Sequence, residues 1–548
     1  MRSQIRQDLK QLCLFTILLL STGGWLVSQT AATSTIDPRE ASGRLILVLP
    51  FDNRSGQSNL GWIGDSFPDT LSQRLSSVGF LTIARDDRQF ALDHLGLPVD
   101  FKPSRATTIR IAQTLDADYV VVGNYTVRNG RIAVQAQVLE VNKLRMSPPL
   151  VDSSELPRLF DIENAIAWKV ARQIDPNLKV ALQTFIGASE GVKLSSFENY
   201  TRGTDATTPQ ERIKRLQLAV QETPTYSAAL LALGKAQYAE RDYDHAAATL
   251  AKIVPGDRLA LEAGFYLGLA RFNAAKYADA ESAFAFVASR LPLPEVVNNE
   301  GVAASRQGHD ATPLFQRAST SDPNDADYHY NLAVSLLRRG DFAGAQREVT
   351  AALKLRSNDV EATELLSNIN AGRRIPLPGA SSGPADTASH FEPLERIRRT
   401  YTEASFRQAA FQMDQMRAAR IATLPATEQA TQYLQQGQDY LSQGLLPEAE
   451  QEFQSAISAD PRNPLAHAAL ARVREQSNNS DEARSEAQLS LNLRPNAAAY
   501  LVLARLDLKA NQLPAAASDI GNALRLEPNN SAAKGMSQAL QARGQAVP

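Results

Sequence analysis

The sequence predicts an N-terminal α/β domain, a mixed sheet with flanking helices, followed by an all-α solenoid in two arrays. Three observations predict this fold class. Short apolar runs of strand type alternate with amphipathic helical segments as far as about residue 175. Alanine-rich helix pairs then repeat, and Leu233-Gly234 returns as Leu267-Gly268 34 residues later. Residues 373–393 are rich in Pro, Gly and Ser, and we expect them to link the two arrays.

The first 32 residues differ in kind from the rest of the chain. Arg2, Arg6 and Lys10 precede the apolar run LCLFTILLL, and small residues follow it, as in an export signal. Two possibilities stay open: a cleaved signal peptide over residues 1–32, or a signal anchor that crosses the inner membrane with residues about 11–28. Both export the rest of the chain, because the basic flank stays inside. We therefore expect a periplasmic protein that contacts the membrane only through this segment, if it is not cleaved.

Composition excludes some classes of function. The chain has 548 residues with 57 basic and 59 acidic side chains, so it has no broad positive field that would attract nucleic acid. Its one cysteine, Cys13, lies in the N-terminal apolar run, so the exported body has neither disulfides nor thiolate metal ligands. The six histidines show no metal-ligand spacing. The sequence therefore predicts no metal and no cofactor.

The α/β domain is expected over residues 44–186. Its predicted elements, in chain order, are strand 44–51, helix 67–78, strand 81–85, helix 106–115, a hairpin around Asn129-Gly130 and helix 159–174. Asn-Gly between two runs of β-branched residues is a strong hairpin signal. The alternation of strands and helices predicts a layered α/β arrangement.

Five stretches of this domain carry a family resemblance: VLPFDNRSG, GDSFPDTLSQRL, LTIARDDRQF, IAQTLDADYVVVGNYTVRNGRIAVQAQVLEV and LFDIENAIAWKVA. They follow one another through most of residues 44–175, and the segment resembles the FlgO-like and TolB amino-terminal domains of bacteria. The resemblance implies an interaction domain of the cell envelope with no agreed catalytic role.

The helical part resembles the tetratricopeptide repeat, a helix-turn-helix unit of about 34 residues. Small residues recur at matching positions: Gly234, Gly268, Gly301 and Ala333 in one array, and Gly437, Ala471 and Ala504 in another. A small residue is needed where the two helices of a unit cross, because a larger one would push them apart. We expect a first array at 195–372, a helical connector at 394–424, a second array at 425–530 and a C-terminal capping helix and tail at 531–548.

In tetratricopeptide proteins the first helix of each pair lines a concave groove, which indicates candidate partner-binding residues here. In the first array they are Asn298, Asn299, Arg306, Tyr330, Asn331, Val334, Leu337 and Arg338; in the second they are Leu434, Gln438, Leu441, Arg472, Arg505 and Lys509. Asparagine side chains can hold the backbone of an extended peptide by donating and accepting together, and Arg306 and Arg338 favour an acidic ligand. Tyr330 and Leu337 could instead pack against the next repeat.

Two other stretches raise different functions. Asp52, Asn53, Arg54 and Ser55 lie in a loop after a strand, where α/β sheets often bind ligands, although turn formation also explains them. Gly64-Asp65-Ser66-Phe67 is similar to the signature of Gly-Asp-Ser serine hydrolases. The Asp-x-x-His pattern that could serve it lies further down the chain and contains His245, which belongs to the repeats. We therefore expect Ser66 to be a helix N-cap with Asp69 as its capping-box partner.

These patterns together predict a non-enzymatic scaffold of the bacterial envelope that binds partner proteins or peptides in its repeat grooves. One alternative is an envelope sensor whose α/β domain binds a small ligand through residues 52–55. A remote alternative is a serine hydrolase that uses Ser66.

Overall fold

The computed structural model describes residues 44–97, 104–187, 191–373, 392–401 and 403–547. The predicted signal segment, residues 1–32, and nearly all of the predicted linker lie outside the described residues. Within the described ranges, none of the helices combines the length and the apolar character needed to cross a membrane.

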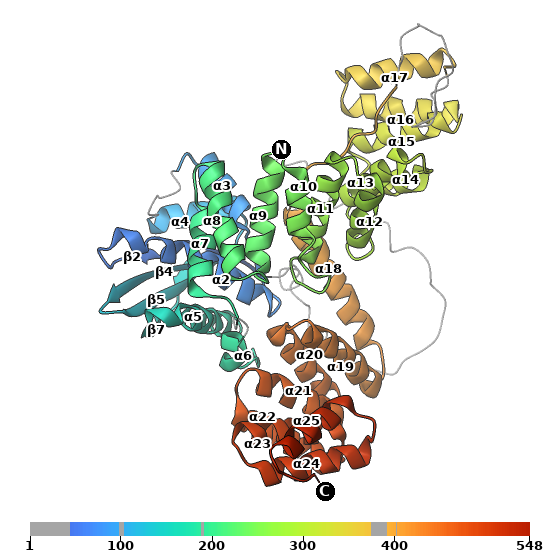
Figure 1. The fold of residues 1–548 in the computed structure, drawn as a ribbon. Coiled ribbons are helices and arrows are strands. Elements are labelled where there is room, and N and C mark those ends of the chain that lie inside the picture. The colour runs from blue at the N-terminus through green and yellow to red at the C-terminus, as the bar shows by residue number, and fades with distance from the viewer. Residues whose placement is uncertain (1–43, 98–103, 188–190, 374–391, 402, 548) are drawn as a thin grey trace, which may run out of the picture. The chain divides into compact units, whose positions relative to one another are not determined.

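The N-terminal domain is built on a mixed sheet of seven strands (Figure 1). The strands are β1 (Leu45–Val48), β2 (Asp52–Asn53), β3 (Leu81–Thr82), β4 (Tyr119–Arg128), β5 (Arg131–Glu140), β6 (Arg145–Met146) and β7 (Leu150–Glu155). Their order is β3-β1-β4-β5-β6, with β2 also on β4 and β7 also on β5. Strands β3, β1 and β4 run parallel, whereas β4, β5, β6 and β7 pair antiparallel.

The predicted hairpin joins β4 and β5, which pair along ten residues each from Tyr119–Glu140 to Arg128–Arg131. Asn129 has a φ of 51° and Gly130 a φ of 74°, both in the left-handed region. A two-residue turn with two positive φ angles matches the twist of the flanking strands, which is why Asn-Gly is favoured there.

Helices cover both faces of the sheet. The helices are α2 (Trp62–Ser76), α3 (Arg85–His94), α4 (Arg105–Thr114) and α5 (Leu159–Ile174). One core contains the apolar sides of α2 and α5 with the inward residues of β1, β4 and β5, and a second core holds α3 and α4 on the other face. The sequence missed α3, β2, β6 and β7, which are short or have no periodic apolar pattern.

All regular secondary structure in the rest of the described chain is helical (Figure 1). The helices up to the linker are α6 (Leu182–Gly187), α7 (Leu194–Thr204), α8 (Pro209–Glu222), α9 (Ser227–Ala239), α10 (Tyr243–Leu250), α11 (Ala260–Asn273), α12 (Tyr277–Ala288), α13 (Pro294–Arg306), α14 (Thr312–Ser321), α15 (Ala326–Arg338), α16 (Phe342–Leu355) and α17 (Val360–Asn370). Those after it are α18 (Glu403–Ala422), α19 (Ala426–Ser442), α20 (Leu446–Ala459), α21 (Pro464–Gln476), α22 (Ser480–Leu493), α23 (Ala497–Lys509), α24 (Leu513–Leu526) and α25 (Ser531–Ala542).

The small residues lie where the helices of a pair cross, as the sequence predicts. A Cβ added to Gly268 would lie 2.6 Å from the ring of Phe284, and one added to Gly437 would lie 2.4 Å from the ring of Phe453. Both phenylalanines are fully buried in the second helix of their pair. No side chain fits at these crossings unless the helices separate.

The predicted helical connector, residues 394–424, is wrong at its N-terminal end. Helix α18 begins only at Glu403, and residues 392–401 have no regular secondary structure. We call residues 392–401 the strap. Its backbone groups bond to side chains of the first array, so a helix is not needed to satisfy them.

Candidate functional site

The strap lies against α13 and α15, the first helices of two successive repeats. The contact is made by residues that we call the strap site: Asn298, Asn299, Ser305 and Arg306 on α13, and Tyr330, Asn331 and Arg338 on α15. These helices present the face that the sequence predicts to be concave and to bind partners.

Three asparagines hold the backbone of the strap. Asn331 donates from Nδ2 to the Arg396 carbonyl at 2.8 Å and accepts the Arg396 N–H at Oδ1 at 2.7 Å. Asn299 makes the same pair of bonds to Arg398, both at 2.7 Å. Asn298 adds a bond to the Arg396 carbonyl at 3.0 Å. All three asparagines are fully buried, so each amide replaces water that the strap backbone would otherwise bind.

The two paired asparagines occupy the same place in successive repeats. Asn299 lies two residues before Gly301, and Asn331 two residues before Ala333. The strap residues that they bind, Arg398 and Arg396, are two positions apart. Alternate residues of an extended chain present their backbone groups on the same side. The repeat therefore holds an extended segment in a fixed register, whatever its side chains.

A carboxylate of the strap is buried against two arginines. The Glu395 side chain is 0% exposed and forms ion pairs with Arg338, 5% exposed, and with Arg306 at 3.5 Å. The Ser305 hydroxyl also donates to Glu395. Arg338 donates further to Ser305 at 2.7 Å and to the Pro393 carbonyl at 3.1 Å. Burying a carboxylate is costly unless it is paired in this way.

The next strap residue enters an acidic and aromatic setting. The Arg396 guanidinium lies 3.8 Å from the centre of the Tyr330 ring, a cation–π contact. It donates two bonds of 2.7 Å to Asp359 and one of 2.9 Å to Asp327. These hydrogen bonds hold the pKa of the Asp359 carboxyl below its ordinary value.

A second arginine has a similar setting at the N-terminal end of α15. Arg398 forms ion pairs with Asp325 and, at 3.5 Å, with Asp327. Its guanidinium lies 5.3 Å from the centre of the Tyr328 ring. Ile397, between the two arginines, packs against apolar residues of the first array. The site therefore distinguishes four successive side chains: acidic, basic, apolar and basic.

The predicted residues of the first array divide into two groups. Those that contact the strap are Asn298, Asn299, Arg306, Tyr330, Asn331 and Arg338. Val334 and Leu337 lie instead in the core formed with α16 and α17, 0% and 1% exposed. Their side chains point away from the strap because the apolar face of α15 packs against the next helices. Tyr330 belongs to both groups, because it lies in this core and its ring also contacts the Arg396 guanidinium.

Sequence reasoning missed the strap itself and the acidic residues Asp325, Asp327 and Asp359. A usable signal is the alternation of Glu395-Arg396-Ile397-Arg398, which an extended chain places on opposite sides. The acids also precede or begin helices, where N-capping already explains them: Asp325 accepts from Asp327 N, and Asp359 from Ala362 N. Capping thus concealed their contact with the arginines.

The predicted residues of the second array make different contacts. Leu434 and Leu441 lie in the core around Phe453 and not on a groove surface. Arg505 bonds both oxygens of Glu475, at 2.9 and 2.7 Å, and Lys509 lies 3.5 Å from the Asn478 side chain. Gln438 and Arg472 are exposed.

The loop after β1 forms a turn. The side-chain Oδ1 of Asn53 accepts the Ser55 N–H at 2.9 Å, and its Nδ2 donates to the Gln57 backbone carbonyl at 2.9 Å. The Ser55 hydroxyl accepts the Val127 N–H at 2.8 Å, and Arg54 bonds Asp52 at 3.3 Å. The polar groups that suggested a small-ligand site are used in this turn and in its pairing to β4.

Ser66 is not the helix N-cap that the sequence predicts. Helix α2 begins at Trp62, so Ser66 lies inside it, fully buried, and donates to the Ile63 carbonyl at 2.8 Å and to Glu163. Asp69, the expected capping partner, instead accepts from Arg85 at 3.1 Å. Burial raises the pKa of the Glu163 carboxyl to about 8. His245 lies on α10 and bonds Asp242, at 2.8 Å, so the hydrolase arrangement is not assembled.

Helix α2 can begin at Trp62, before Pro68, because the Phe51 N–H supplies the hydrogen bond that Pro68 cannot donate. Pro68 has no N–H to donate to the Gly64 carbonyl four residues before it. That carbonyl accepts the Phe51 N–H instead, at 3.0 Å. A Cβ on Gly64 would lie 2.3 Å from the Phe51 carbonyl oxygen, so glycine is required for this approach.

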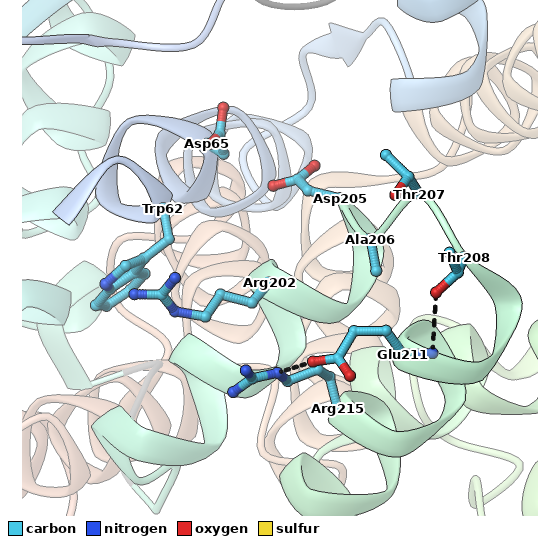
Figure 2. Close-up of a pocket in the computed structure, with 9 residues that line it drawn as sticks. All are labelled: Trp62, Asp65, Arg202, Asp205, Ala206, Thr207, Thr208, Glu211 and Arg215. Carbon is cyan, nitrogen blue, oxygen red and sulfur yellow. Dashed lines mark hydrogen bonds and ion pairs between the residues drawn. The ribbon is translucent and has the colours of Figure 1, made fainter. Parts of the chain in front are cut away.

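A polar pocket of about 420 Å³ lies between α2, α7 and α8 (Figure 2). Figure 2 shows its lining residues Trp62, Asp65, Arg202, Asp205, Ala206, Thr207, Thr208, Glu211 and Arg215. Arg215 donates to Glu211 at 2.7 Å, and Arg202 donates to the Asn59 carbonyl at 2.7 Å. Burial raises the pKa of Asp65 to about 6. Within the described ranges, no cluster of three or more His, Cys, Asp or Glu could hold a metal ion.

Comparisons with known proteins identify the repeats. Tetratricopeptide repeat family models match residues 314–347 and residues 440–506. The first match runs from α14 into α16 and contains the whole of α15, and the second runs from α19 to α23. No curated protein matches this chain.

Several solved structures are similar to parts of the chain. MamA 41-end from Desulfovibrio magneticus RS-1 is 19% identical over 31% of this chain and 99% of its own, with a TM-score of 0.29. YrrB, a TPR protein with an unusual peptide-binding site, is 14% identical over 36% of this chain and 97% of its own, with a TM-score of 0.26. The LpoB C-terminal domain from Salmonella enterica is 23% identical over 21% of this chain and 84% of its own, with a TM-score of 0.18. With its two family matches, the chain contains tetratricopeptide repeats, a class of repeat that binds proteins or peptides.

Proposed function

We propose that this protein is a non-enzymatic interaction scaffold of the bacterial envelope that binds extended segments of partner proteins on the first array. The observation that carries this proposal is the pair of asparagines, Asn299 and Asn331, that each bond both the N–H and the C=O of one residue of an extended segment. Backbone recognition of this kind suits a site that accepts peptides.

The N-terminal segment and the resemblance of the α/β domain support the location. A basic, apolar and then small-residue order is typical of export, and FlgO-like and TolB amino-terminal domains belong to the envelope. Cell fractionation with N-terminal sequencing tests this part. Recovery of the full-length chain in the cytoplasm would contradict it.

The partner is sought by cross-linking in intact cells and purification of the full chain. Asn299→Ala with Asn331→Ala should remove the specific partners, because both backbone anchors are lost. Asn324→Ala with Asn370→Ala is a matched control, since these two asparagines of the same array are exposed. If both double variants recover the same proteins as the parent chain, the first array does not bind partners through this site.

A further inference from the structure

We propose that strap residues 395–398 are an internal ligand, and that the strap site takes partner peptides with the same order of acidic, basic, apolar and basic side chains in an extended conformation. This inference rests on the proposed function and adds two statements to it: which peptide chemistry the site recognises, and that the strap competes with that peptide.

The chemistry of the ligand follows from what surrounds each strap side chain. Glu395 is enclosed by Arg306 and Arg338, so a neutral or basic residue there would leave two buried arginines without a counter-charge. Arg396 is enclosed by Asp327 and Asp359 and the Tyr330 ring, a setting that suits a planar cation and excludes an acid. Charge therefore sets the order of residues and the direction of the peptide.

The strap contacts the first array in the way that a bound peptide would, and not as one of its core elements. Helices α15, α16 and α17 share a core of their own, and residues of the strap do not belong to it. The contacts of the strap are mainly hydrogen bonds and ion pairs to polar side chains, and its Leu394 is 52% exposed. The core shared by α15, α16 and α17 is therefore complete whether or not the strap is seated, while Ile397 and Tyr401 of the strap add packing against two neighbouring apolar clusters.

The fit of the strap is also imperfect. Oε2 of Glu395 and Nε of Arg338 are buried without a hydrogen-bond partner. Such atoms weaken the attachment, because each has lost its hydrogen bonds to water and gained no hydrogen bond in return. Glu395 leaves the site together with the strap, so a partner peptide whose acidic group also bonds the Nε of Arg338 replaces the strap on favourable terms.

Competition by a tethered segment has a measurable consequence. While the strap is seated, only the fraction of molecules with an open site binds a peptide, and the apparent affinity falls by that fraction. Weakening the strap must then tighten the binding of a peptide added from outside.

The test uses the full chain and a fluorescent peptide of residues 392–401, EPLERIRRTY, in an anisotropy titration. The strap variant Glu395→Ala with Arg396→Ala should bind the peptide at least about tenfold more tightly than the parent chain. Leu394→Ala, a change at an exposed strap side chain, should leave the affinity at the parent value. Asn331→Ala added to the strap variant should abolish binding, and a peptide with Lys in place of Glu395 should not bind the strap variant.

The outcomes separate this inference from the proposed function. The inference is overturned if the peptide binds the parent chain and the strap variant with equal affinity, or binds neither. The proposed function still stands in that case if the capture of partner proteins depends on Asn299 and Asn331. Tighter peptide binding without any captured envelope protein supports the inference and contradicts the function. Thermal melting checks that each variant is folded, and Glu395→Gln, which removes only the charge, should show the same direction of change if the double variant does not fold.

Discussion

The two arrays have the same crossing geometry but different polar residues on their first helices. In the first array, the position two residues before the small crossing residue is Ala232, Tyr266, Asn299 and then Asn331, and the two asparagines are buried where the strap binds. In the second array the same position is Gln435, Ala469 and Val502. Ala469 and Val502 have no polar side-chain atom that could bond a peptide backbone, and Val502 lies in the core of the second array. Crossing residues thus determine the fold, while two or three polar positions determine whether an array binds an extended chain.

The largest expected effect comes from removing a charge partner of the strap. Arg338→Ala leaves Glu395 without its main counter-charge in a buried place, and loss of one partner of a buried pair costs about 3–5 kcal/mol. The strap should detach, so the amides of Arg396 and Arg398 should lose protection in hydrogen exchange. Arg505→Ala in the second array removes a partner of Glu475 from a more exposed pair and should cost about 1 kcal/mol or less. Equal costs at the two sites would remove the distinction between the arrays.

An intermediate effect is expected where the arrays are alike. Gly437→Ala places a Cβ 2.4 Å from the Phe453 ring and should destabilise the second array by about 1–3 kcal/mol through overpacking. Gly301→Ala, with its nearest atom in Phe315 at 2.9 Å, should act in the same direction on the first array. The matched control is Gly535→Ala on α25, where nothing lies within 4 Å and the change should be neutral or stabilising. Chemical denaturation measures all three, and an unaffected Gly437 variant would contradict the crossing geometry.

The smallest effect is a difference in pH dependence between the arrays. Hydrogen bonds from Arg396 lower the pKa of Asp359, so their stabilising contribution is present above the ordinary aspartate pKa and is lost as the pH falls through the lowered value. A hydrogen bond to Glu486 raises the pKa of His467, so that contribution is complete below the ordinary histidine pKa and is lost as the pH rises through the raised value.

Acid should therefore loosen the strap of the first array, and mildly basic pH should weaken the second. Melting curves of Asp359→Asn and His467→Gln across pH 3–9 measure this. Each variant should lose the dependence of its own array, and an unchanged acid response in Asp359→Asn would show that other carboxylates cause it.

The sequence is sufficient for the repeats and for the placement of the asparagines on the first helices of their units, because both follow a fixed spacing that reflects steric or hydrogen-bonding needs. It was insufficient for the strap. Residues 394–401 contain Glu and Arg, which favour helices, and distant side chains of the first array, Asn299 and Asn331 above all, supply the backbone partners that make an extended form stable. Val334 and Leu337 were misplaced because one helix has both a groove face and a core face, separated by a small rotation.

Ser66 was misplaced for a comparable reason. Ser, Pro and Asp in that order match the chemistry of a helix start, and local sequence does not reveal that Phe51 provides the hydrogen bond that Pro68 cannot. The β2 and β7 strands were missed because the sheet neighbours β4 and β5, and not their own composition, give them their pairing.

The Phe51–Gly64 hydrogen bond also makes the strand and the helix depend on each other. An isolated α2 would have an unsatisfied carbonyl in its first turn, and the segment after β1 would have an unsatisfied amide. The two segments should therefore gain and lose order together, as one cooperative unit. Native-state hydrogen exchange should give the Phe51 amide the same opening free energy as the amides in the middle of α2.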